Sequence, residues 1–271
     1  MQYGLEIVPV GPFSDPRKVV ALAQAAEAAG WEGIYVWDHV LFGPYGAGDP
    51  WVALAAVAAT TSRLKLCTGV APLPRYRPHL LARTLAALDL LSQGRVIFGT
   101  GLGVAGDFTP FGEPGDDKRR AAMTDEGLEL LISLWSGEEI THAGSHYTAT
   151  NTQLLPAPVQ KPHIPIWIGG DSNAALRRAA RWDGWIIGTI DEQCQITKTP
   201  ARIAAQVAYI HQQRTSDGPF DVAIDGVSTA GDATLPQEYA QAGATWWFEA
   251  IFLSRAPEEE LLRRIAAGPP M

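Results

Sequence analysis

Asp38 and His39 are the residues of this chain whose types and spacing point most directly to chemistry. They follow a β-type run, Gly33–Trp37, and the carboxyl ends of parallel strands are where barrel enzymes place catalytic side chains. A histidine that titrates near neutral pH can accept or deliver a proton, and a neighbouring carboxylate can hold its ring N–H. Either this pair handles a proton in a reaction, or Asp38 caps a turn and His39 is an ordinary loop residue.

Glycines mark the ends of two further β-type runs, Leu64–Val70 and Arg95–Gly99. The helical segment 78–91 between these runs predicts a parallel strand–helix–strand unit. The residues at the two ends are Gly69 with Val70, and Gly101 with Leu102 and Gly103. A glycine has no Cβ, so a flat ring or a phosphate could approach the backbone there.

A third glycine-rich junction, Gly169-Gly170-Asp171-Ser172, precedes a predicted helix over 174–181. Backbone N–H groups at a strand–glycine–helix junction suit a phosphate, and the Ser172 hydroxyl could add a hydrogen bond. The alternative is that Ser172 or Asp171 simply caps the helix. Asp171 would repel a phosphate unless its side chain points away.

Several cations fall in loops that the predicted strand–helix order places on the same face of the molecule as these strand ends. They could attract an anionic ligand, or they could be solvated surface charges. These residues are Arg75, Arg77, Lys118, Arg119 and Arg120.

Eight β-type runs, each followed by helical periodicity, must position these residues. The expected strands are Tyr3–Val10, Gly33–Trp37, Leu64–Val70, Arg95–Gly99, Ile164–Ile168, Trp185–Gly188, Asp221–Asp225 and Thr245–Ala250. Asp15-Pro16 and Asp49-Pro50 are typical helix starts. Eight strand–helix repeats in 271 residues predict an α/β fold, a TIM (β/α)8 barrel forming a single domain over 1–271.

One segment interrupts the repeat. Residues 139–162 lie between the fourth helix and the fifth strand and are rich in Thr, Gly and Pro, so they predict an accessory insertion such as a hairpin. In the last strand, Trp246 and Trp247 should point to opposite faces by strand alternation.

Composition narrows the class of protein. A formal net charge of −8 and a pI near 5.2 disfavour general affinity for nucleic acid or for anionic membranes. No apolar run approaches the roughly 18 residues that span a bilayer, and the N-terminus lacks the features of a signal peptide. We therefore expect a cytoplasmic protein.

Cysteine and histidine spacing gives no metal signal. Cys67 and Cys194 have no CxxC spacing, and neither HxH nor HExxH occurs, so we expect no metal site and no disulfide framework.

In three long segments the chain resembles the luciferase-like monooxygenase superfamily, whose members bind FMN or the deazaflavin coenzyme F420 in a TIM barrel. The segments are TGVAPLPRYRPHLLARTLAALDLLSQGRVIFGTGLG, LISLWSGEEITHAGSHYTATNTQLLPAPVQKPHIPIWIGGDSNAALRRAARWDGWIIG, and the closing ATWWFEAIF with RIAAGPP. Their order and spacing cover nearly the whole chain, and they imply the coenzyme F420-dependent group.

The resemblance implies roles for the residues introduced above. His39 would act as acid or base and Asp38 would orient His39 or contact the coenzyme ring. Gly69 and Val70 would back the ring through a cis peptide bond, and Gly101, Leu102 and Gly103 would touch its pyrimidine and ribityl portions. Gly169, Gly170 and Ser172 would hold the coenzyme phosphate.

The resulting prediction is an oxidoreductase that transfers a hydride between coenzyme F420 and a small organic substrate in the barrel mouth. One alternative is a monooxygenase that receives reduced FMN from a separate reductase and uses oxygen. Another is a non-catalytic barrel that binds a ligand or a partner subunit. The loop VPVGPFSDP after the first strand has no Glu, unlike sugar-phosphate dehydrogenases of the group. The resemblance also implies a homodimer.

Overall fold

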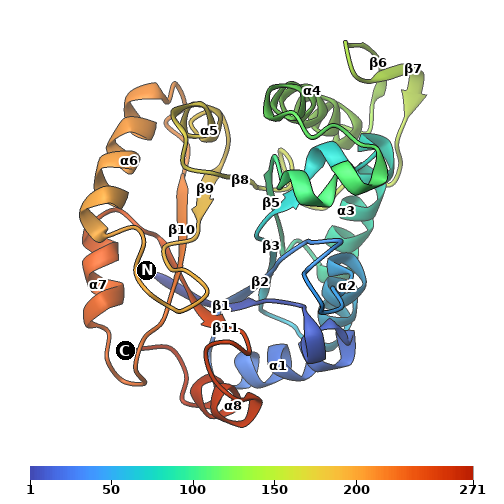
Figure 1. Ribbon diagram of the computed structural model, residues 1–271. Helices are drawn as coiled ribbons and strands as arrows, with labels where there is room; N and C mark the ends of the chain where they lie inside the picture. Colours follow the sequence, from blue (N-terminus) through green and yellow to red (C-terminus); the bar gives the residue numbers. More distant parts are fainter. Residues whose placement is uncertain (271) are drawn as a thin grey trace.

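Eight parallel strands close into a barrel in the computed structural model, which describes residues 1–270 (Figure 1). The barrel strands are β1 (Gln2–Ile7), β2 (Gly33–Val36), β3 (Lys65–Thr68), β5 (Val96–Gly101), β8 (Ile166–Gly169), β9 (Gly184–Ile187), β10 (Asp221–Gly226) and β11 (Trp246–Ile251). Pairing of β3 with β5 and of β1 with β11 closes the ring, and every neighbouring pair is parallel. The two-residue β4 (Ala71–Pro72) extends the edge of β5. The predicted TIM barrel is confirmed.

Helices surround the barrel, one after each strand, with α2–α4 on one side and α5–α7 on the other (Figure 1). The helices are α1 (Pro16–Ala28), α2 (Pro50–Thr60), α3 (Pro78–Ser92), α4 (Asp117–Trp135), α5 (Asn173–Ala179), α6 (Pro200–Gln213), α7 (Thr234–Gln241) and α8 (Glu258–Ala266). Short 3-10 helices span Gly11–Ser14, Leu73–Arg75, Ala105–Asp107 and Thr109–Phe111. The caps of α1 and α2 are the predicted ones, because Asp15 accepts from the Arg17 N–H and Asp49 from the Val52 N–H.

The strands differ from the predicted ranges at their ends. β1 stops at Ile7 and does not reach Val10, because Pro9 has no N–H to donate to a strand ladder. β3 stops at Thr68, before the Gly69–Val70 peptide, while β5 continues to Gly101.

The insertion is a two-stranded antiparallel hairpin of β6 (Glu139–Ala143) and β7 (Thr148–Gln153), which stands beyond α4 (Figure 1). Its turn is fixed to α4 by Glu126, whose carboxylate accepts the backbone N–H groups of Ser145, His146 and Tyr147. These backbone hydrogen bonds lower the pKa of Glu126 despite its partial burial, so it remains a strong acceptor. The predicted accessory hairpin is confirmed.

The core has two parts, one between strands and helices and one inside the barrel. Strand alternation divides the residues of β11 between them: Trp246 and Phe248 point inward, while Trp247 packs outward against Tyr239. The inner cluster fills the barrel with Tyr35, Cys67, Ile97, Trp167, Ile186, Ala223, Trp246 and Phe248. This packing leaves the carboxyl ends of the strands as the place for a ligand.

Over residues 1–270, no helix combines the length and the apolar character needed to cross a membrane.

Candidate functional site

A cavity of about 190 Å³ opens at the carboxyl ends of the barrel strands. It is lined by Glu6, Tyr35, Trp37, Gly69, Val70, Gly169, Gly170, Ile186, Ile187, Gly188 and Asp225. A larger depression of about 450 Å³ lies outside the barrel between α3, α4 and the hairpin. We place the candidate site in the smaller cavity, because it lies at the strand ends and contains four residues predicted to bind a coenzyme.

Val70 forms one wall of this cavity, and glycines on two neighbouring strands make room for it. The Gly69–Val70 peptide is cis, as the family resemblance implies. A Cβ on Gly169 would lie 2.8 Å from one methyl of Val70, and a Cβ on Gly101 would lie 3.1 Å from the other. Both distances are tighter than normal contacts, so Gly101 and Gly169 are required for Val70 to lie over the barrel.

Gly101, Leu102 and Gly103, which were predicted to touch the coenzyme, do not line this cavity. Gly103 has a φ of +70°, and a Cβ there would lie 2.7 Å from Pro72. The turn after β5 and the close packing against Pro72 therefore explain why residue 103 is a glycine.

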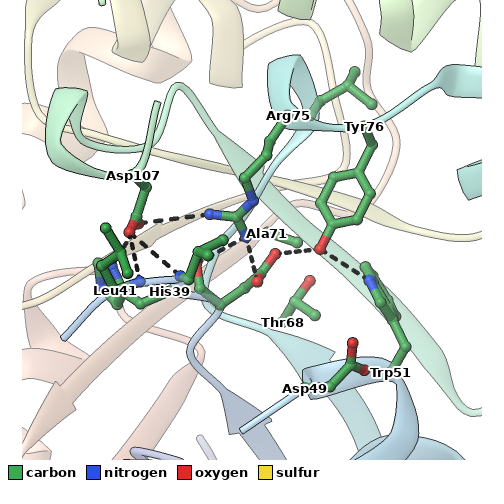
Figure 2. A network of polar contacts seen from close by, with 12 residues as sticks. His39, Leu41, Asp49, Trp51, Thr68, Ala71, Arg75, Tyr76 and Asp107 are labelled. Carbon is green, nitrogen blue, oxygen red and sulfur yellow. Dashed lines mark hydrogen bonds and ion pairs between the residues drawn. The ribbon is translucent and has the colours of Figure 1, made fainter. Parts of the chain in front are cut away.

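His39 lies beside the cavity and is held by Asp107, which the sequence analysis did not single out (Figure 2). The His39 Nδ1 atom is 2.8 Å from Asp107 Oδ2, and Asp107 Oδ1 accepts the backbone N–H groups of Val40 and Leu41. The His39 ring centroid is 5.7 Å from that of Trp37, which lines the cavity. Asp107 lies in the loop after β5, 68 residues from His39, so no local pattern pairs the two.

Asp38 does not hold the His39 imidazole, which corrects one of its two predicted roles, while contact with the coenzyme ring stays a prediction. The Asp38 carboxylate contacts the Arg75 guanidinium in an ion pair and accepts the Tyr76 hydroxyl at 2.6 Å, and the Trp51 indole N–H donates to that hydroxyl at 3.0 Å (Figure 2). The two predicted residues therefore have different partners, Arg75 and Tyr76 for Asp38 and Asp107 for His39. Burial raises the pKa of Asp38, and the positive charge of Arg75 opposes that shift.

Two of the five cations considered as attractors of an anionic ligand, Arg75 and Arg120, are paired with carboxylates of the protein. Arg75 lies between two carboxylates, since its second terminal nitrogen is 3.5 Å from Asp107, and its side chain is 9% exposed. Arg120 is buried, pairs with Asp117, and lies 4.8 Å above the Phe108 ring. The exposed cations are Arg77, Lys118 and Arg119.

At the Gly169–Ser172 junction, the capping interpretation describes the observed contacts. The Ser172 hydroxyl accepts the Ala175 N–H at 3.2 Å and caps α5. Asp171 lies 3.1 Å from Arg202 and 3.9 Å from Lys198, so two cations offset its negative charge at this junction.

Two acids in the cavity, Glu6 on β1 and Asp225 on β10, were also missed by the sequence analysis. Glu6 is 1% exposed and accepts the Trp37 indole N–H at 2.7 Å. Burial, and then the charge of Asp225, raise the pKa of Glu6 well above its ordinary range. Burial raises the pKa of Asp225 to about 6. The available signal was an acid at an inward position of a strand in an otherwise apolar barrel.

No cluster of His, Cys, Asp and Glu side chains with the arrangement of a metal site occurs in the part of the chain that the structure describes.

Comparisons with known proteins show the family of this chain. The profile of the family described as "Luciferase-like monooxygenase" matches residues 5–266. An uncharacterized protein of Mycobacterium tuberculosis is 40% identical over 213 residues, covering 69% of this chain and 72% of that protein. An "F420-dependent glucose-6-phosphate dehydrogenase" of Beutenbergia cavernae is 35% identical over 179 residues, which are 63% of this chain and 52% of the relative. The match therefore spans about half of that relative's length.

Solved structures share the fold. The coenzyme F420-dependent tetrahydromethanopterin reductase of Methanopyrus kandleri superposes with a TM-score of 0.79 at 18% identity, covering 98% of this chain and 97% of that one. An F420-dependent secondary alcohol dehydrogenase, in complex with an F420-acetone adduct, gives 0.80 at 17% identity, with 99% and 98% covered. The oxygenating constituent of a Pseudomonas putida diketocamphane monooxygenase with FMN gives 0.72 at 17% identity, with 86% and 68% covered.

Proposed function

The chain belongs to the luciferase-like monooxygenase family of F420- or flavin-dependent oxidoreductases, and from this premise we propose that it transfers a hydride between coenzyme F420 and a small organic substrate. The observation that carries the proposal is the cavity at the barrel mouth, where Val70 and glycine backbone form one wall and Trp37 places His39 at the edge.

The residues present fit a flat ring with polar edges. Gly69, Gly169 and Gly170 expose backbone to the cavity, and the Val70 methyl groups offer an apolar surface beside them. Glu6 lines the cavity, and its buried Oε2 atom has no hydrogen-bond partner in residues 1–270. When bound, the coenzyme would supply the hydride chemistry, and these residues would hold its ring.

His39 is the residue we assign to proton transfer. The Asp107 carboxylate accepts a hydrogen bond from Nδ1, which orients the ring, keeps a proton on that nitrogen and leaves Nε2 as the nitrogen that can take up or release a second proton. The His39 side chain is 26% exposed, so Nε2 can exchange a proton with substrate or solvent. Asp107 is thus a positioning residue, and Asp38 supports the site by holding Arg75.

The F420-dependent relatives support this coenzyme over FMN. The FMN-containing monooxygenase of similar fold supports the second candidate, an oxygen-using enzyme supplied with reduced FMN by a separate reductase. A non-catalytic barrel is the third.

Titration of the purified protein with coenzyme F420, and separately with FMN, distinguishes the three candidate functions when binding is monitored by tryptophan fluorescence. Trp37 lines the cavity, so a ring bound there should quench its emission, and a Trp37→Phe variant should lose that part of the signal. Binding of coenzyme F420 alone supports the proposal. Binding of FMN alone favours the monooxygenase, and binding of neither favours the non-catalytic barrel.

We also propose a homodimer, as the family resemblance implies. Light scattering that gives the mass of one 29.1 kDa chain at micromolar concentration would contradict it.

A further inference from the structure

The inner wall of the mouth cavity carries two acidic side chains. Glu6 comes from β1 and Asp225 from β10, and β11 lies between these strands in the barrel. Glu6 is 1% and Asp225 5% exposed. Two buried carboxyl groups on one cavity wall need partners, because a buried charge or polar atom without one is destabilising.

The partners within the protein satisfy only part of this pair. Glu6 Oε1 accepts the Trp37 indole N–H, and Asp225 Oδ1 accepts the Thr189 backbone N–H at 2.5 Å. Glu6 Oε2 is fully buried and has no hydrogen-bond partner in the described chain. Because the Glu6 side chain lines the cavity, a donor group held in the cavity would supply the partner that this oxygen lacks.

The charged groups around the pair do not neutralise it. The positive charge of Lys198 lowers the pKa of Asp225, but its ammonium donates to the Gly188 carbonyl at 2.9 Å. Arg255 is paired with Glu249 at 2.7 Å. Tyr35 faces Glu6 from β2 and lowers its pKa, but no hydrogen bond of normal geometry joins the two in residues 1–270. Two further groups are affected by the pair: burial and, to a smaller degree, the charges of Glu6 and Asp225 raise the pKa of the Cys194 thiol, and burial, followed by the charge of Asp225, raises the pKa of Tyr239.

We propose that Glu6 and Asp225 form an acceptor subsite that receives an N–H or O–H donor of the bound ligand and disfavours carboxylate and phosphate groups. The free Glu6 oxygen would accept the hydrogen bond, and the second carboxyl group would repel an anion. This inference deepens the proposed function, on which its choice of ligands rests. The donor has two sources, the ring N–H of the coenzyme or a hydroxyl or amino group of the substrate.

A pair of small probes tests the subsite directly. Benzyl alcohol and benzoate share a phenyl ring, but one carries an O–H donor and the other an anion. NMR titration at pH 7.5, observed at the Trp37 indole N–H that touches Glu6, should show benzyl alcohol binding at least roughly tenfold more tightly than benzoate. In the double variant Glu6→Gln/Asp225→Asn the ratio of the two affinities should fall to near one.

A matched control keeps the comparison specific. Glu259→Gln removes a carboxylate that is 84% exposed on α8, and it should keep the wild-type ratio. Circular dichroism and thermal unfolding of each variant report folding, and each single variant should show part of the change in the ratio.

Titration with coenzyme F420 distinguishes the two sources of the donor. If the coenzyme supplies it, the double variant should bind coenzyme F420 roughly tenfold more weakly than wild type. If the substrate supplies it, coenzyme affinity stays the same and the coenzyme-saturated protein still prefers benzyl alcohol. If coenzyme F420 does not bind at all, the proposed function fails, and the probes on the free protein still decide the subsite. Benzoate binding as tight as that of benzyl alcohol, no benzyl alcohol binding, or an unchanged ratio in a folded double variant would overturn the inference.

Discussion

Replacing Asp107 by asparagine should change which nitrogen of His39 carries the proton. In the wild type the Asp107 carboxylate is 2.8 Å from Nδ1 and can only accept, so the Nδ1–H tautomer is fixed. An asparagine of the same shape can keep its oxygen on the Val40 and Leu41 N–H groups, at 3.3 and 3.1 Å. Its amide N–H then faces Nδ1 and favours the Nε2–H tautomer, which removes the acceptor that we assign to proton transfer.

The magnitude follows from the contacts that are lost. A hydrogen bond to a charged group contributes about 1.5–3 kcal/mol, and Arg75 keeps its ion pair with Asp38 after the change. The free energy of unfolding should therefore fall by about that amount, a decrease in Tm of roughly 3–12 °C for a chain of this size. The cost is below the 3–5 kcal/mol expected for a buried charge left without any partner.

Nitrogen-15 NMR of the His39 ring reads the tautomer without a known substrate, and thermal unfolding gives the stability. Asp38→Asn is the matched control, because it removes the other carboxylate that contacts Arg75 but makes no contact with the imidazole. It should destabilise the protein and leave the His39 tautomer unchanged. A wild-type tautomer in Asp107→Asn, or a switched tautomer in Asp38→Asn, would refute the reasoning.

Three further predictions concern the cavity and its support. Gly169→Ala places a Cβ 2.8 Å from Val70 and should weaken coenzyme binding at least roughly tenfold. Gly106→Ala is the control, because its Cβ meets nothing within 4 Å, and it should leave coenzyme affinity unchanged. Fluorescence titration of both variants with the coenzyme checks this. The folded-state pKa of Asp225, about 6, exceeds its ordinary value, so its contribution to stability is full below about pH 4 and is lost as the pH rises through 6. Between pH 4 and pH 7.5, the free energy of unfolding of the wild type, measured with denaturant, should fall by about 3 kcal/mol relative to that of Asp225→Asn. A difference between the two proteins that does not change with pH would contradict this prediction. Glu249→Gln removes the fully buried carboxylate that pairs with Arg255 and Arg264, and it should lower the free energy of unfolding by about 3–5 kcal/mol. Denaturant unfolding measures this change, and a decrease of less than about 1 kcal/mol would contradict the prediction.

Local patterns in the sequence determined the barrel and its caps. Alternation of apolar residues marks the eight strands, and the Asp-Pro pairs at Asp15 and Asp49 begin two helices as predicted, because these signals act over a few neighbouring residues. The same periodicity predicted that Trp246 and Trp247 point to opposite faces, and the structure shows that Trp246 is the inward one. The position of the site at the strand ends also follows from the parallel topology alone.

Only the tertiary structure decided which side chains meet at that site. His39 is held by Asp107 and not by its neighbour Asp38, and Glu6 faces Asp225 across β11. Strand periodicity states which side of the sheet a residue faces, but the partner across the mouth depends on how the barrel closes and how long loops lie over it. That closure brings together residues that are 68 positions apart, as in the contact of His39 with Asp107, and no local pattern encodes such a pair.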